Sequence, residues 1–288
     1  MKTQTHLMKF ARLVLVAVLT VLSSWALLAD GQESGQPFFF IQITDIQFGM
    51  HDGNKGFAPE TALYEKAIAG INRLKPDFVV ITGDFVHDPN DEAQINEFKR
   101  LTAKINPGIP VYMIPGNHDV GQVPDKASLR KYKSNYGKDT FAFDHKGSRF
   151  VGFNTSLVKA ELPIMERQFN WLKRSLKKGK NAHQLIVFGH YPFFIQSFDE
   201  PEKYSNIKME YRSKYLEMFR VSGVDAIFSG HLHNNAQGEY KGISLVTTSA
   251  VGKPLADAPS GLRIVKVYAD RITHHYYGLD ELPDMVVF

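Results

Sequence analysis

The sequence predicts an α/β fold in which two β-sheets pack face to face and helices cover their outer faces. The runs "FFFIQIT" (38–44) and "DFVVITG" (77–83) are apolar at successive positions, as in strands of a sheet that is covered on both sides. Segments with helical spacing alternate with such runs through most of the chain. Near its end the helices stop and hairpin-like strands follow, which favours a second sheet.

The elements follow in a regular order. After the strand at 38–44, a helix is expected over 59–75, with Pro59 in its first turn, and the strand at 77–83 comes next. Three further helix–strand pairs are expected at 91–105 with 109–115, 164–178 with 183–189, and 209–223 with 224–230. The runs 242–250, 262–269 and 271–278 are expected to be strands of the second sheet, joined by short Gly or Asp turns. The irregular stretch 196–206 is long for a connector and is a candidate rim of a site.

The first 29 residues have the pattern of a secretory signal. A basic start precedes "LVLVAVLTVL" and then small residues, with cleavage expected after Ala26 or Ala29. The alternative is an uncleaved anchor, because Leu13 to Ala29 is about long enough for a thin bilayer. The expected organisation is therefore a signal peptide or N-terminal anchor (1–29), a flexible linker (30–37) and one domain (38–288). We expect export to the periplasm or the exterior, and membrane contact only if the leader is uncleaved.

Charge and cysteine content exclude several classes of protein. The chain of 288 residues has a net charge of +4 and a pI near 9.0, but three basic and no acidic residues lie within 1–29, which leaves +1 for the remainder. A nearly neutral domain has no electrostatic footprint for nucleic acid. Cysteine is absent, so a disulfide framework and thiolate metal ligands are excluded. Any metal must be held by Asp, Glu, His, Asn or Gln side chains.

Polar side chains follow five of the expected strands, at the point where each strand ends. The motifs are Asp45-Ile-Gln47, Gly83-Asp84, "GNHD" (116–119), "GHYP" (189–192) and "GHLH" (230–233). Each motif by itself is consistent with a turn, a helix cap or a core histidine. Because strand ends of α/β sheets gather at one edge, five such motifs in order predict that their side chains meet there. The candidates are Asp45, Asp84, Asn117, His118, His190, His231 and His233.

Carboxylates, amides and imidazoles without thiols suit divalent Mn, Fe, Zn or Mg. Seven candidates are enough for two ions if one carboxylate bridges them, as in two-metal hydrolytic sites. Such a pair activates water for attack on phosphorus and clamps the phosphate oxygens. Of the other histidines, His87 follows Gly83-Asp84 closely enough to line the pocket, whereas His274 and His275 are expected to be structural or exposed.

In this order, the five motifs resemble those of the calcineurin-like metallophosphoesterases over residues 38 to about 277. The resemblance implies a four-layer αββα sandwich of two mixed sheets flanked by helices, with a dinuclear metal centre at the sheet edge. It implies a first metal site from Asp45, position 47, Asp84 and His233. The second site would use Asp84 as a bridge together with Asn117, His190 and His231. Phosphate would be bound by Asn117 and His118, with Tyr191 at the substrate entrance.

The resemblance also implies that His118 donates a proton to the leaving oxygen and that Asp119 orients His118 by accepting from its other ring nitrogen. The sequence departs from the family pattern at Gln47, where most members have His. With Gln at this position, the first motif resembles that of the branch typified by calcineurin-like phosphoesterase domain-containing protein 1. An amide oxygen still ligates, although it is a weaker donor than imidazole and prefers harder ions.

These observations favour a metal-dependent phosphomonoesterase that acts on a phosphorylated small molecule or phosphoprotein. A phosphodiesterase for cyclic nucleotides or lipid head groups uses the same kind of centre and is the alternative. A non-catalytic phosphate-binding relative is a third reading, which only Gln47 supports. Two further pairs, Phe193-Phe194 and Asn234-Asn235, are placed either to line the entrance or to serve core packing and turn formation.

Overall fold

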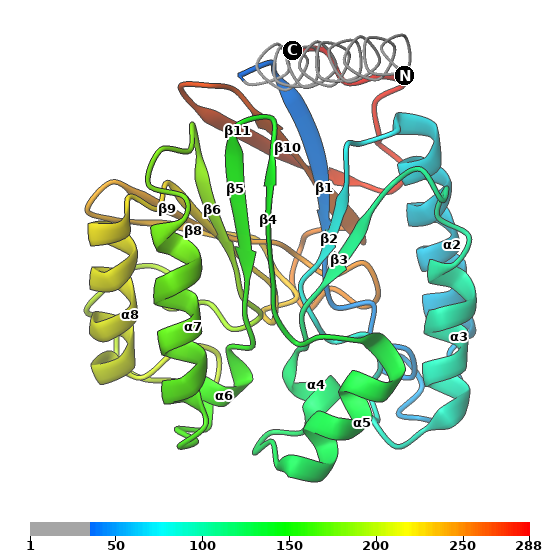
Figure 1. Ribbon diagram of the computed structural model, residues 1–288. Coiled ribbons are helices and arrows are strands. Elements are labelled where there is room, and N and C mark those ends of the chain that lie inside the picture. The colour runs from blue at the N-terminus through cyan, green and yellow to red at the C-terminus, as the bar shows by residue number, and fades with distance from the viewer. Residues whose placement is uncertain (1–34) are drawn as a thin grey trace, which may run out of the picture.

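The computed structural model describes residues 35–288, which form two stacked mixed β-sheets with helices on both outer faces (Figure 1). The predicted leader, 1–29, and residues 30–34 of the predicted linker lie outside the described residues. Within 35–288, no helix combines the length and hydropathy that a membrane span requires. The predicted αββα arrangement is confirmed.

The first sheet has the strand order β11-β10-β1-β2-β3. These strands are β1 (Phe38–Ile43), β2 (Val79–Ile81), β3 (Val111–Met113), β10 (Gly261–Val267) and β11 (Ile272–Gly278). The second sheet has the order β4-β5-β6-β7-β9-β8. Its strands are β4 (Phe141–His145), β5 (Ser148–Gly152), β6 (Leu185–Phe188), β7 (Ala226–Ser229), β8 (Ala236–Tyr240) and β9 (Ile243–Thr247).

The prediction that the late strands form a sheet of their own was wrong. β9 joins the second sheet beside β7 in parallel, whereas β10 pairs antiparallel with β1 in the first sheet and β11 pairs with β10. The pairing of strands far apart in sequence depends on which faces they bury, and local pattern does not encode that choice. Six further elements of residues 35–288 were not predicted, namely the two strands of the β4–β5 hairpin, β8 and the helices α4 (Asn117–Val120), α5 (Lys126–Tyr136) and α6 (Ser156–Lys159).

The helices divide between the two sheets (Figure 1). α2 (Ala58–Leu74) and α3 (Glu92–Thr102) pack on the first sheet, and α7 (Met165–Lys177) and α8 (Met209–Ser222) pack on the second. Successive strand residues point to opposite faces, so Phe39 and Ile41 of β1 meet the helices while Phe38 and Phe40 lie between the sheets. This double burial explains why the run "FFFIQI" has almost no polar residues.

Aromatic rings fill the space between the two sheets. Phe40 stacks on Phe78 with ring centroids 5.0 Å apart and meets Phe150, Phe188 and Phe228 edge to face. Truncation of a buried Phe to Ala typically costs about 3–5 kcal/mol of folding free energy. The sheets are thereby fixed against each other, and the relative positions of their strand ends are fixed with them.

The parallel strands of both sheets end at the same end of the molecule. β1, β2 and β3 run parallel in the first sheet, as do β5, β6, β7 and β9 in the second. The short helices α4 (Asn117–Val120) and α6 (Ser156–Lys159) lie at this lower end in Figure 1, and the C terminus lies at the opposite end. The loops after these strands are therefore placed to build one site.

Candidate active site

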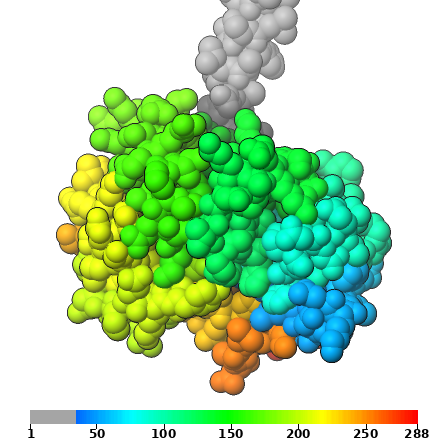
Figure 2. Space-filling view, turned by 90° about the horizontal axis from the view of Figure 1, so that it is seen from below, coloured from blue at the N-terminus to red at the C-terminus, as the bar shows by residue number. Residues whose placement is uncertain are grey.

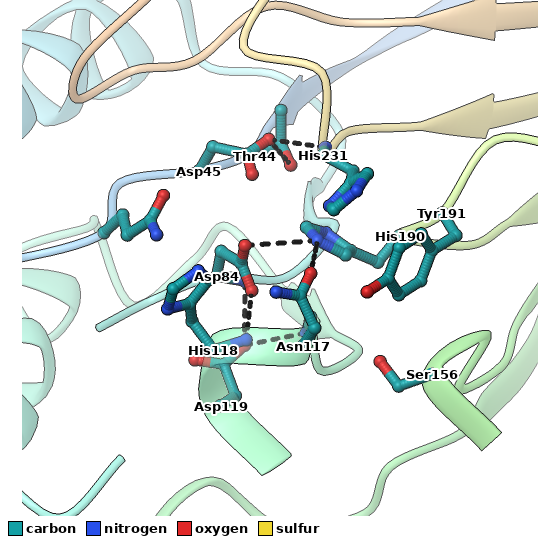
Figure 3. A network of polar contacts seen from close by, with 12 residues as sticks. Thr44, Asp45, Asp84, Asn117, His118, Asp119, Ser156, His190, Tyr191 and His231 are labelled. Carbon is teal, nitrogen blue, oxygen red and sulfur yellow. Dashed lines mark hydrogen bonds and ion pairs between the residues drawn. The ribbon is translucent and has the colours of Figure 1, made fainter. Parts of the chain in front are cut away.

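The predicted strand-end residues converge in the structure. Figure 3 shows six of them, namely Asp45, Asp84, Asn117, His118, His190 and His231. Two groups of buried side chains each bring their ligand atoms within 4.8 Å of one another. One group is Asp45, Asp84 and His233, and the other is Asp84, His190 and His231. Asn117 joins the second group, since its Oδ1 lies 3.0 Å from His190 Nε2. Asp84 belongs to both groups and lies between them.

The backbone at these positions is strained. Asp45, Gln47, Asp84, His231 and His233 have φ between 47° and 73°, the left-handed region that residues with a Cβ rarely adopt. Such strain costs of order 1 kcal/mol or more per residue and concentrates at functional sites. It turns the chain sharply just after β1, β2 and β7, so that these polar side chains point inward to one another.

Asp45 and His233 form the outer part of the first group. Asp45 Oδ2 accepts hydrogen bonds from Thr44 Oγ1 at 2.7 Å and from the backbone N–H of His231 at 2.9 Å. The other oxygen, Oδ1, lies 3.4 Å from His233 Nε2 and has no hydrogen bond. His233 Nδ1 donates to the carbonyl of Lys253 at 2.6 Å, which leaves Nε2 to face Asp45.

His190 and His231 form the outer part of the second group. His190 Nδ1 donates to the carbonyl of Thr82 at 2.8 Å, and Nε2 lies 3.2 Å from Asp84 Oδ2. His231 Nε2 is buried and has no hydrogen-bond partner. Metal-ligating histidines typically donate their second ring N–H to a carbonyl or carboxylate, as His190 and His233 do.

The charges of the buried groups are strongly coupled. Burial disfavours a charge on His190, but the Asp84 carboxylate outweighs burial and raises the pKa of His190 to about 9. Burial and the adjacent His190 lower the pKa of His231 to about 3, so this imidazole is neutral at neutral pH. Burial opposes ionisation of Asp84 as well, yet His190 and two other histidines lower its pKa.

These donors fit a pair of divalent cations. Asp45 Oδ1, Gln47 Oε1 and His231 Nε2 are buried atoms without hydrogen-bond partners, and each offers a lone pair. A buried polar atom without a partner is costly unless something else binds it. Carboxylate, amide and imidazole donors around one shared carboxylate are the ligand set of a two-metal site. The two groups therefore provide the cofactor site for two divalent ions.

The structure corrects the predicted role of Asp119. Its carboxylate does not contact the His118 ring but accepts hydrogen bonds from three backbone N–H groups, those of Asp84, Phe85 and Gly116, each at 2.8 Å. His118 Nδ1 instead donates to the carbonyl of His87 at 2.8 Å. The tight loop packing draws Asp119 toward the strand ends, so a main-chain carbonyl takes over the orienting role.

Other predicted positions separate into site and core. Tyr191 is buried with its ring 4.1 Å from that of His231, and its hydroxyl donates to Gln122 Oε1 at 3.3 Å. Phe193 and Phe194 belong to the core under the second sheet, so their reading as packing residues is confirmed. Of the Asn pair, Asn234 Oδ1 accepts the backbone N–H of Asn235 at 2.9 Å, a local contact typical of turns, and Asn235 Oδ1 accepts from Arg263 Nη2 and the backbone N–H of Ser249.

Two residues of the site were not assigned roles from sequence. Tyr204 comes from the irregular 196–206 loop and is 60% exposed, and its hydroxyl accepts hydrogen bonds from Asn117 Nδ2 and Gln122 Nε2 at 3.2 Å. The prediction that this loop borders the site is thereby confirmed. His87 stacks on His118 with ring centroids 4.8 Å apart, in agreement with its expected position at the pocket. Nothing in the local pattern distinguishes Tyr204 from other exposed tyrosines.

A second segment borders the site beyond His233. The stretch after β9, orange in Figure 2, projects at the edge of the face onto which the strand ends open. Two hydrogen bonds connect it to the site. The backbone carbonyl of Lys253 accepts from His233 Nδ1, and the backbone N–H of Leu255 donates to the His233 carbonyl at 2.9 Å. Leu255 itself is 62% exposed. The rim therefore carries both an exposed aromatic ring and an exposed aliphatic side chain.

Comparison with known proteins agrees with this geometry. The calcineurin-like phosphoesterase family model matches residues 40–235, which is more than half of the chain. The chain belongs to the calcineurin-like phosphoesterase family. It is 35% identical to the serine/threonine-protein phosphatase CPPED1 of Bos taurus over 268 residues, which cover 86% of each chain. The human CPPED1 is also 35% identical, over 269 residues and 86% of each chain.

Among solved structures, a dimetal phosphatase from Danio rerio shares the calcineurin-like fold with a TM-score of 0.64. It is 14% identical in sequence, and the match covers 85% of this chain and 97% of that one. Family membership, the CPPED1 relatives and the paired donor groups together identify the chain as a phosphoric ester hydrolase with a metal centre.

Proposed function

We propose that this calcineurin-like phosphoesterase is a metal-dependent phosphomonoesterase. The observation that carries the proposal is the pair of buried donor groups sharing Asp84, with His118 beside them. When bound there, two divalent cations supply Lewis acidity toward phosphate oxygens and lower the pKa of water. A chain that only binds phosphate has no need of an imidazole held with one ring nitrogen free.

In this proposal the first cation is held by Asp45, Gln47, Asp84 and His233. The second cation is held by Asp84, Asn117, His190 and His231. The His118 ring is held by one nitrogen, because Nδ1 donates to the His87 carbonyl. Its other nitrogen, Nε2, has no hydrogen bond to residues 35–288. In its doubly protonated form, His118 would give the Nε2 proton to the leaving oxygen as water oxygen adds to phosphorus and the P–O ester bond breaks.

We propose that the substrate is bound beside Asn117, His118 and Tyr191. Asn117 and His118 are consecutive residues at the start of α4, and the backbone N–H of His118 donates to Asp84 Oδ1 at 2.8 Å. The Tyr204 ring lies 6.4 Å from that of Tyr191 and is exposed to solvent on this side. Because the CPPED1 relatives are named serine/threonine-protein phosphatases, a phosphorylated Ser or Thr side chain is the substrate class we propose.

Hydrolysis of an aryl phosphate and of a bis-aryl phosphate by the purified chain tests this proposal. We expect turnover of the monoester in the presence of Mn²⁺, its loss after chelation, and recovery on adding Mn²⁺ back. A large preference for the diester would make the phosphodiesterase the better assignment. The absence of any metal-dependent turnover on either ester, in a chain that still binds phosphate, would favour the binding protein.

We also propose that the chain is exported. The support is the pattern of residues 1–29, a basic start, an apolar run and small residues before Asp30. N-terminal sequencing of the protein isolated after expression in a secreting host tests this proposal. A mature chain that begins near residue 27 or 30 supports cleavage, and an intact start at Met1 in the membrane fraction supports the anchor instead.

A further inference from the structure

Gln47 meets an unassigned side chain at the edge of the first donor group. Its amide nitrogen Nε2 lies 3.1 Å from Nδ1 of His87, and its oxygen Oε1 is buried without a hydrogen-bond partner. His87 comes from the segment after β2, forty positions along the chain. The two ends of this amide are therefore in different situations, one bound by an imidazole and one left free.

The chemistry of the two groups fixes the direction of this hydrogen bond. An amide nitrogen carries two hydrogens and no lone pair for accepting, so Gln47 donates and His87 Nδ1 accepts. Neutral His87 then carries its proton on Nε2. A planar amide that is held by its nitrogen directs its oxygen away from His87, and this oxygen is the atom able to bind a cation.

His87 is itself held firmly enough to act as such an anchor. Its backbone N–H donates to the carbonyl of Phe48 at 2.9 Å and to Gln94 Oε1 at 3.0 Å. Its ring stacks on that of His118 at an interplanar angle of 18°, and its carbonyl accepts from His118 Nδ1. The His87 ring is thus restrained on one face by His118 and at one edge by Gln47.

We propose that His87 is a positioning residue of the first cation site, which holds the Gln47 amide so that Oε1 is presented as the ligand. An amide without this partner rotates about its last torsion and turns either its oxygen or its nitrogen toward the cation, and only the oxygen binds. The second amide of the centre follows the same pattern, since Asn117 Nδ2 donates to the Tyr204 hydroxyl while Oδ1 faces His190. The inference rests on the two-cation centre of the proposed function.

The test is a calorimetric titration of the metal-free full-length chain with Mn²⁺ alone. Elemental analysis then counts the bound ions. His87→Phe keeps a ring on His118 but removes the Nδ1 acceptor. We expect the affinity of one of the two ions to fall about 10–100-fold, the usual effect of removing a partner of a metal ligand. His275→Phe, an exposed histidine on β11, is the matched control and should bind both ions like the parent.

Two further backgrounds show whether His87 acts through Gln47. In a Gln47→Ala chain, adding His87→Phe should cause no further loss, because the amide that it positions is gone. In a Gln47→Glu chain, adding His87→Phe should also cost little, because either carboxylate oxygen binds a cation. Equal losses from His87→Phe in all backgrounds would show that His87 binds the ion itself and would overturn the proposal, as would unchanged affinity in the single variant.

Folding and turnover are measured separately so that the two proposals can fail independently. The thermal unfolding midpoint of each metal-free chain shows whether a loss of ion binding reflects a loss of fold. If His87→Phe also lowers this midpoint, ion binding by the double variant Gln47→Glu with His87→Phe distinguishes the two explanations. Recovered ion binding supports the positioning role of His87, and continued loss of binding overturns it. A parent chain that binds two ions but does not hydrolyse the aryl phosphate ends the proposed function and leaves this inference to be decided by the variants.

Discussion

The carboxylate of Asp119 holds the backbone of Asp84 in place, with Oδ2 accepting the Asp84 N–H at 2.8 Å. Since Asp84 has a left-handed backbone and contributes to both donor groups, this contact stabilises a strained residue at the centre of the site. The Gly116 N–H donates to the same Oδ2 atom, so Asp119 also fixes the distance between the β2 and β3 loops. Asp119 therefore acts on the metal centre through the main chain.

Asp119→Asn should destabilise the fold and weaken metal binding. An amide has one oxygen for the three N–H donors, and its NH₂ group meets at least one of them, which leaves a buried donor unsatisfied at a cost of about 1–3 kcal/mol. Denaturant unfolding of the metal-free chain measures this loss. Because Asp119 does not touch the His118 ring, the curve of residual turnover against pH should keep its shape. A shift of one side of this curve along the pH axis would instead support the role that the family resemblance implied, in which Asp119 orients His118.

His118→Ala should lower the turnover of a phosphomonoester by roughly 10²–10⁴-fold, the usual contribution of a general acid. Both cations should remain bound, because His118 belongs to neither donor group. The measurement is kcat on two monoesters, one with a good and one with a poor leaving group. The loss should be larger for the poor leaving group, which depends more on protonation. Equal losses on both esters would instead assign His118 to phosphate binding.

Tyr204 should influence both the second cation site and substrate binding. Tyr204→Phe removes the hydroxyl that accepts from Asn117 Nδ2, and we expect about a tenfold loss in affinity for one ion. Tyr204→Ala also removes the exposed ring and should raise KM for a phosphopeptide more than for a small aryl phosphate. Tyr268→Phe, remote from the donor groups, serves as the control. An unchanged KM in Tyr204→Ala would remove the ring from the substrate-binding surface.

The stability of the fold at low pH should depend on Asp77, at the end of the sandwich away from the site. Its Oδ1 accepts hydrogen bonds from His145 Nε2 at 2.9 Å and Lys146 Nζ at 2.7 Å, and these tie β2 to the β4–β5 turn. Burial opposes ionisation of Asp77, but the hydrogen bonds prevail and lower its pKa. Because the pKa of Asp77 in the folded state is below its unfolded value of about 3.9, the ionised carboxylate stabilises the folded state at pH values above about 3.9.

That contribution is lost as the pH falls through the lower folded pKa. Asp77→Asn should therefore be less stable than the parent at pH 7, and the difference in unfolding free energy should shrink below about pH 4. Urea unfolding across this range measures it. Asp257→Asn, an exposed carboxylate with no ion pair in the described part of the chain, should show no such trend. A difference that is constant with pH would assign the effect to packing.

Residue pattern was a reliable guide to the elements and donors that depend on local sequence. Runs such as 38–44 and 77–83 are apolar because both faces of those strands are covered. Burial of both faces can therefore be predicted from the residue types alone. The motifs after the strands were equally readable, because parallel strands of one layer must end at one edge. Asp45, Asp84, Asn117, His190, His231 and His233 were all predicted and do lie together.

Tertiary structure alone decided the relationships that depend on distant segments. The late strands were divided between two sheets by the faces they bury, and Asp119 bonds to three main-chain donors because the β2 and β3 loops pack closely. His87 and Tyr204 were brought to Gln47 and Asn117 across forty and eighty-seven positions, respectively. Local sequence specifies which chemical groups a strand end presents, whereas their hydrogen-bond partners are selected only when the whole chain has packed.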